Sequence, residues 1–178
     1  MKYIFTIIIC FIITNNLIAQ DRYITKQGTI SFFSHSPVED IEAINNQILS
    51  IVDIETGDIA ISVLMKSFMF EKSLMQEHFN ENYVESDKFP KAKFTGKIID
   101  IKDSTDKNKV FIEGDLTIHG ITNKVKVKAD IEVDNNVSLK GVFTVLVADY
   151  EINIPSVVKN NIAKTIEITF SLNHKKFK

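Results

Sequence analysis

The sequence predicts an all-β protein, with roughly eight antiparallel strands arranged as an up-and-down barrel or a sandwich. The first reason is that apolar and polar side chains alternate along several stretches, as they do along a strand with one buried face. The second is that short polar segments separate these stretches, as in antiparallel hairpins. The third is size, since 178 residues are enough for one ordinary domain but not for a multidomain enzyme.

The most regular alternation runs from Lys124 to Asp134. Valine, alanine and isoleucine occupy one face of this stretch, and lysine, aspartate and glutamate occupy the other. A helix would distribute those charges around its whole circumference. The same period of two predicts strands at residues 110–118, 137–145, 59–65, 92–98 and 165–173, and less regular strands at 29–34 and 45–53.

Polar segments between these stretches predict the turns. Gly57 lies in the segment 53–58 and is free to adopt a positive φ. Segment 134–136 contains two asparagines, which tolerate left-handed backbone. Segment 119–123 joins two predicted strands, and Asp103 to Asn108 forms a charged loop.

Two segments interrupt the strand pattern. A Ser-x-x-Gln sequence beginning at Ser73 has the form of a helix capping box. The sequence that follows predicts a short helix from Ser73 to about Asn82, with one apolar stripe made of Met75, Phe79 and Tyr83. This stripe either plugs one end of the sheet core or covers a cavity. Pro155 suits the first position of a second short helix that reaches Ala163.

Residues 1–19 have the pattern of a secretory signal peptide. Lys2 supplies a positive start, the run from Ile4 to Ile13 is apolar apart from one threonine, and the small Ala19 suits cleavage after it. The apolar run is about half of the roughly 20 residues that cross a bilayer, which argues against a transmembrane anchor. We therefore expect a periplasmic or secreted protein whose mature domain spans residues 20–178, without the discarded Cys10.

Composition excludes several classes of function. The chain has 21 basic and 23 acidic side chains and a formal net charge of -2, so it lacks the basic excess of a nucleic-acid-binding protein. A single cysteine excludes a disulfide framework, an iron–sulfur cluster and a cysteine-based zinc site.

The sequence also gives no indication of a catalytic or metal site. The histidines at 35, 78, 119 and 174 lie in different predicted elements, without the spacing of a metal site. No nucleophile elbow or glycine-rich phosphate loop occurs. Asp115 and His119 both fall on the face of the predicted strand opposite the apolar row at 110–118. Because that row is expected to face the interior, we expect both side chains to point outward. His78 lies near the predicted cavity mouth, where it either binds a head group or is simply solvated. We therefore predict a protein without catalytic activity, metal or cofactor.

Four segments of the chain, in order, resemble the YceI-like family. Residues 114–122 read GDLTIHGIT, which is similar to the family's Gly-Asp-Leu-Thr-Ile-x-Gly-Val-Thr signature. Segments 74–79, 86–94 and 149–155 resemble the family's helix, its following strand entry and its closing segment. The sequence departs from the family pattern at 33–36, where a tryptophan is often found, and at 123–124, where many members have Lys-Pro.

The resemblance implies a secreted, lipocalin-like antiparallel barrel that holds an isoprenoid chain, such as a polyprenyl phosphate or a quinone tail. A barrel of about eight strands is just wide enough to be filled by side chains or to hold one slender ligand. Small residues on the predicted inward rows, at Gly96, Gly114, Ala129 and Gly141, are expected to leave volume for it.

The predicted ligand-contacting residues come from the aromatic and methionine-rich region around the helix and from the inward rows. They are Met65, Phe68, Phe70, Met75, Phe79, Tyr83, Phe94, Ile112, Leu116, Val127, Ile131, Phe143 and Phe170. Periodicity fits a filled barrel as well as a hollow one. The alternative function is therefore a ligand-free envelope domain that acts through protein contacts at an exposed apolar patch.

Overall fold

A computed structural model describes residues 22–99, 101, 109–158 and 161–177 of the chain. The predicted signal peptide at 1–19, Cys10 and the predicted loop from Asp103 to Asn108 lie outside these residues.

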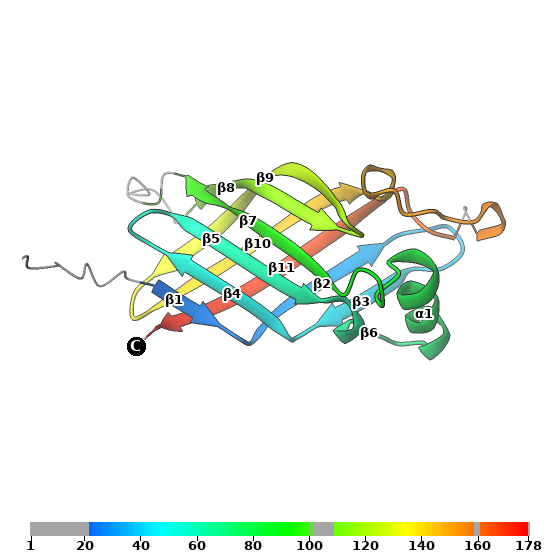
Figure 1. Cartoon of the computed structure of the whole chain (residues 1–178), viewed down its shortest axis with the longest axis horizontal. Coiled ribbons are helices and arrows are strands. Elements are labelled where there is room, and N and C mark those ends of the chain that lie inside the picture. Colours follow the sequence, from blue (N-terminus) through cyan, green and yellow to red (C-terminus); the bar gives the residue numbers. More distant parts are fainter. Residues whose placement is uncertain (1–21, 100, 102–108, 159–160, 178) are drawn as a thin grey trace, which may run out of the picture.

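The described strands form one closed antiparallel ring, which confirms the all-β barrel prediction (Figure 1). Around the ring the order is β1-β4-β5-β7-β8-β9-β10-β11, and pairing of β11 with β1 closes it. The strands are β1 (Arg22–Thr25), β2 (Gly28–Ser34), β3 (Ile41–Asn45), β4 (Ile48–Asp53), β5 (Asp58–Leu64), β6 (Met69–Phe70), β7 (Lys91–Ile99), β8 (Lys109–Ile118), β9 (Ile121–Val133), β10 (Asn136–Leu146) and β11 (Thr165–Lys176).

The first four segments make two long, bent barrel strands. β1 and β2 form one of these strands, and both pair with β11. β3 and β4 form the other: β4 pairs with β1, and β3 pairs with β2. Buried polar side chains bind the backbone at the bends. Thr25 Oγ1 accepts from the Gln27 amide at 3.1 Å, and Asn45 Oδ1 accepts from the Gln47 amide at 2.8 Å. The ring therefore contains eight strands. β1, β3 and the short β6 were not predicted, because they carry too little alternation of their own.

The turns agree with the sequence prediction. Gly57 has a φ of 76° in the β4–β5 turn, where its amide donates to the Asp53 carbonyl at 2.9 Å. Gly120 has a φ of 79° in the β8–β9 turn. A side chain at either position would be strained, because L-residues rarely adopt these angles.

The predicted helix is present, but its predicted cap is wrong. α1 (Ser73–His78) continues into a π-helical turn, η2 (Phe79–Tyr83). Lys72 occupies the N-cap position without a side-chain hydrogen bond. Gln76 instead faces the backbone amide of Phe70, with its Oε1 at 3.4 Å from that nitrogen. The remaining helical turns are η1 (Met65–Ser67), η3 (Val147–Tyr150) and η4 (Ser156–Val158), so Pro155 precedes a single 3₁₀ turn rather than a helix that reaches Ala163.

The barrel has a packed end and a covered end. Large aliphatic side chains with almost no exposed surface fill the packed end, among them Val52, Ile131, Val137, Leu139 and Leu172. At the other end lie α1 and the segment that follows η3, away from the C-terminus (Figure 1).

A neutral histidine is buried in the packed end. His174 and Ser50 are both fully buried, with exposed fractions of 0%. His174 Nδ1 lies 3.0 Å from the Val137 carbonyl oxygen, which only accepts, so this nitrogen carries the proton. Nε2 then accepts from the Ser50 hydroxyl at 2.8 Å. Burial lowers the pKa of His174, because the charged ring would lose its hydration there.

This burial predicts a loss of stability at mildly acid pH. An unfolded histidine binds a proton at about pH 6.5, before the buried one does, so the free energy of unfolding should fall as pH decreases from about 6.5 toward the lowered native pKa. His174→Asn keeps the donor to Val137 and removes the titrating ring. Urea unfolding between about pH 8 and pH 5 should show a weaker pH dependence for this variant than for the wild type. His78→Asn, at an exposed position of the helix, is the control and should keep the wild-type slope. Equal slopes for His174→Asn and the wild type would contradict the assignment.

Candidate functional site

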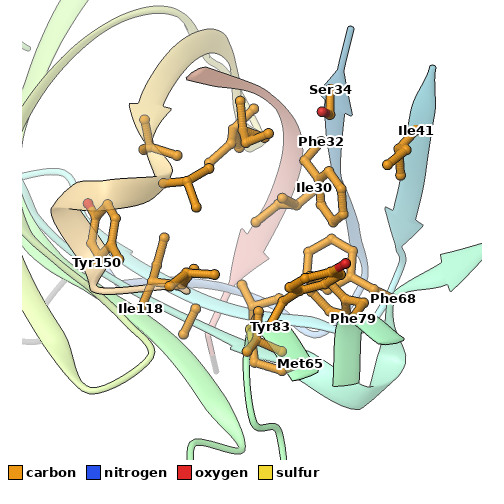
Figure 2. A pocket seen from close by; sticks show the side chains of 18 of the residues that line it. Ile30, Phe32, Ser34, Ile41, Met65, Phe68, Phe79, Tyr83, Ile118 and Tyr150 are labelled. Atoms are coloured by element: carbon orange, nitrogen blue, oxygen red, sulfur yellow. The ribbon is translucent and has the colours of Figure 1, made fainter. Parts of the chain in front are cut away.

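The covered end of the barrel contains an apolar cavity with a volume of about 350 Å³. This volume lies at the lower end of the range for small-molecule sites. Figure 2 shows Ile30 and Phe32 of β2 on one side of the space, with Phe79 and Tyr83 below them, and Tyr150 on the opposite side.

Inward-facing side chains of the strands form the wall of the cavity. They come from the halves of the strands that point away from the packed end. Among them are Ile61, Val63, Ala92, Phe94, Ile112, Leu116, Val125, Val127, Phe143, Val145, Ile166, Ile168 and Phe170. The period-two alternation that predicts the strands is therefore also what makes this wall apolar.

Two chain segments complete the cavity at the covered end. The helical cover (Ser73–Tyr83) contributes Met75, Phe79 and Tyr83. The loop cover (residues 147–158 and 161–164) contributes mostly aliphatic side chains and one tyrosine, namely Val147, Tyr150, Ile152, Ile154, Val158 and Ile162.

A cluster of phenylalanines anchors the helical cover to the barrel. Phe79 packs on Phe32 of β2, Phe68 and Phe70, with ring centroids 5.4, 5.6 and 5.1 Å apart. Such aromatic pairs contribute about 0.5–1.5 kcal/mol each beyond the area they bury. Phe32 was not among the predicted site residues. Phe32 and Phe33 are neighbours on β2, so the alternation does not show which of the two rings faces the interior.

All predicted ligand-contacting residues except one line this cavity. The exception is Ile131, which is 2% exposed and belongs to the packed end, paired in register with Leu139. It lies on the same inward row as Val127, which does line the cavity. The alternation of β9 correctly gives the face of Ile131, but not its depth along the barrel axis. Ligand contact by the lining residues stays a prediction.

The glycines on the inward rows do not leave empty volume, contrary to the expectation from the sequence. A Cβ built on Gly96 or Gly114 would lie 2.8 or 2.7 Å from the Phe94 ring. A Cβ on Gly141 would lie 2.6 Å from the Phe170 ring. These glycines instead allow the two phenylalanine rings to lie directly against the barrel wall.

Few polar groups border the cavity. Ser34 accepts a hydrogen bond from the Ala163 amide at 2.9 Å, so its oxygen is engaged with the loop cover. Glu39 forms an ion pair with Lys72 at the start of the helical cover. His78, although exposed, is among the lining residues, as is Asn161. The cavity can therefore accept hydrocarbon in its interior and polar groups only at its edge.

Within the described residues, no three histidine, cysteine, aspartate or glutamate side chains are close enough to hold a metal ion. Among the same residues, no helix is both long and apolar enough to span a membrane.

The side chain of His119 does not point outward into solvent, contrary to the prediction from the sequence. Asp115 does point outward and pairs with Lys124 at 3.3 Å. The side chain of His119 is only 13% exposed, and it contacts Glu85 and the backbone of Tyr150. Alternation fails at this position because His119 is part of the turn and has a φ of 51°.

A closed antiparallel barrel with an apolar cavity under a short helix defines a lipocalin-like β-barrel. The chain belongs to the YceI-like family, whose domain model matches residues 24–174. No curated relative matches the sequence.

Several solved structures share this fold at low sequence identity. The polyisoprenoid-binding domain from Saccharophagus degradans, implicated in plant cell wall breakdown, has a TM-score of 0.74 at 11% identity, over 89% of this chain and 99% of that one. Burkholderia cenocepacia BcnA has a TM-score of 0.71 at 17% identity, over 82% and 95% of the two chains. The Campylobacter jejuni YceI protein has a TM-score of 0.58 at 15% identity, over 81% and 85%.

The contact between Gly141 and Phe170 gives a testable prediction. In Gly141→Ala the new methyl group would displace the Phe170 ring toward the cavity, and overpacking of this kind costs about 1–3 kcal/mol. In a Phe170→Leu background the ring is absent and the same change should cost clearly less. Urea unfolding of the two single variants and the double variant measures this coupling. Additive costs would show that the ring does not fill the space beside Gly141.

Proposed function

We propose that this protein binds an isoprenoid-type lipid, such as a polyprenyl phosphate or the tail of a quinone, and carries or stores it without chemical change. The observation that carries the proposal is the cavity, whose wall and covers are almost entirely apolar. An apolar cavity favours a hydrocarbon chain at about 25 cal/mol for each Å² of apolar surface removed from water.

The distribution of polar groups supports a definite orientation of this ligand. The deep part of the cavity is bordered by aliphatic and aromatic side chains, including Ile112, Val127 and Phe170. Besides two tyrosines, the polar residues of the lining are Ser34, Glu39, His78, Lys93 and Asn161. Ser34 is engaged with the loop cover, Lys93 is exposed, and the other three come from the β2–β3 loop and the two covers. The hydrocarbon would therefore enter first, and a phosphate or quinone head would stay among the covers. An unpaired polar group in the interior would be costly.

The comparisons support the ligand class indirectly. The similar domain from Saccharophagus degradans is described as polyisoprenoid-binding, and this chain has the same fold and belongs to the YceI-like family. We extend that ligand class to this chain because its own cavity has suitable walls.

A periplasmic or secreted location is part of the proposal. It rests on the signal-peptide pattern of residues 1–19 and on the expected mature chain, which lacks cysteine. Outside the cytoplasm, a lipid with a long chain needs a protein that shields it from water as it moves between membranes.

Binding rather than catalysis fits the surroundings of the titratable groups. His174 is sealed in the packed end, and Asp115 is engaged in an exposed ion pair. Neither lines the cavity. Of the titratable groups that do line it, His78 and Lys93 are exposed and Glu39 is paired with Lys72, so none of these three lies free in the interior, where acid–base chemistry on a bound lipid would need it.

The alternative, a ligand-free domain that acts through protein contacts, would use the outer face of the barrel. Ile44 and Met69 are exposed there and paired in register, and Leu49 and Ile51 are exposed on β4. That function needs no cavity. A substitution confined to the cavity should therefore abolish lipid binding but leave a function through protein contacts intact.

Filling the cavity should abolish lipid binding. Ala92 lines the cavity from β7, and Ala92→Phe would place a ring in the space. Thr95→Phe adds a ring on the same strand at an exposed outward position and is the matched control. Titration with the isoprenoid alcohol geranylgeraniol and with the apolar fluorophore N-phenyl-1-naphthylamine should show at least about tenfold weaker binding for Ala92→Phe only. Unchanged binding by a folded Ala92→Phe variant would reject the cavity as the site.

A further inference from the structure

Three strained backbone positions gather at one junction of the structure. In the described part of the chain, the non-glycine residues with positive φ are Glu85 at 44°, His119 at 51° and Glu151 at 52°. They come from three segments far apart in sequence, yet His119 contacts Glu85 and the residue that precedes Glu151. Each such position costs of order 1 kcal/mol or more, so the surrounding contacts must hold them in place.

His119 is at the centre of this junction. Its Nε2 lies 2.9 Å from Glu85 Oε2, and its Nδ1 lies 3.0 Å from the backbone carbonyl oxygen of Tyr150. The ring also packs edge-on against Phe89, with centroids 4.7 Å apart. The imidazole is thus fixed from three sides in the β8–β9 turn.

The junction joins the two covers of the cavity to the barrel. Glu85 follows the helical cover by two residues, and Tyr150 belongs to the loop cover. The loop cover has a second attachment to the same region, because Asn123 Nδ2 donates to the Asp149 carbonyl oxygen at 2.7 Å. The helical cover keeps its phenylalanine cluster and the Lys72–Glu39 ion pair, so loss of the Glu85 contact would loosen the C-terminal end of this cover, next to Tyr83.

The chemistry of the partners requires two protons on the ring. The Tyr150 carbonyl and the Glu85 carboxylate both accept hydrogen bonds, so both contacts form only when both ring nitrogens carry a proton. The hydrogen bond from His119 lowers the pKa of the Glu85 carboxyl and keeps that acceptor ionised in mild acid. The other charges here are Lys88, 3.8 Å from Glu85, with Asp149 and Glu151 beside Tyr150.

We propose that His119 is a positioning residue that latches the helical cover to the loop cover, so that exchange of the bound lipid is slow while both of its contacts are made and faster when the contact to Glu85 is lost. The inference rests on the proposed function, since it assigns the control of ligand exchange at the same cavity.

The latch predicts an effect on the rate of ligand exchange. Loss of the His119 contact to Glu85 should make this exchange faster. Affinity should change less than the rate, because the latch can form with the cavity empty or filled.

Two variants test the latch. His119→Asn keeps an amide donor near the position of Nδ1 and tolerates a positive φ, but it no longer reaches Glu85. Glu85→Gln keeps the shape of the partner and removes its charge. Asp115→Asn, which breaks an exposed ion pair on the outer face of β8, is the control.

The first measurement is the release of N-phenyl-1-naphthylamine from preloaded protein in a stopped-flow experiment. Both latch variants should release the probe about fivefold faster than the wild type, which corresponds to one lost charged hydrogen bond at a partly exposed site. The affinity of both variants for the probe should change less than the release rate, which a general loss of structure around the cavity would not allow. Equal rates for wild type and both variants, or the same acceleration in Asp115→Asn, would overturn the latch.

The second measurement is amide hydrogen exchange on the ligand-free protein. Residues 73–84 should exchange faster in both latch variants, and the packed end should be unchanged. Wild-type protein that binds neither the probe nor geranylgeraniol would contradict the proposed function. In that case the exchange data alone would decide the latch, and unchanged protection of 73–84 would reject it.

Discussion

Closure of the strand ring is the constraint on which the rest of this structure depends. In a closed antiparallel sheet, every second side chain points into one shared interior, whatever its size. The two ends of this interior are filled to different degrees. Aliphatic side chains such as Leu139 and Leu172 fill one end, and the other end stays hollow. One ring thus provides both a packed core and an apolar cavity.

The hollow end is shaped by rings rather than by missing side chains. Phe94 lies against Gly96 and Gly114, and Phe170 lies against Gly141. The phenylalanines around Phe79 attach the helical cover in the same way, ring against ring. The cavity is therefore bounded by stiff aromatic surfaces, which keep their shape better than flexible side chains.

The sequence predicts the barrel well because alternation and turn chemistry are local properties. It predicts the face of a residue but not its depth, which explains why Ile131 belongs to the packed end and Val127 to the cavity. The capping-box prediction failed because Gln76 faces the backbone of Phe70, in the short strand just before the helix, instead of the helix start. The role of His119 was inaccessible for a different reason, since it depends on a turn conformation and on partners distant in sequence.

Native mass spectrometry of the protein, purified without detergent from the cells that produce it, tests the central claim most directly. If the covered end of the barrel is a lipid site, the spectrum should show the chain carrying one apolar molecule, and fragmentation should identify an isoprenoid. The Ala92→Phe variant should appear without it. A wild-type chain found only at its unliganded mass, and unable to take up geranylgeraniol afterwards, would contradict this account.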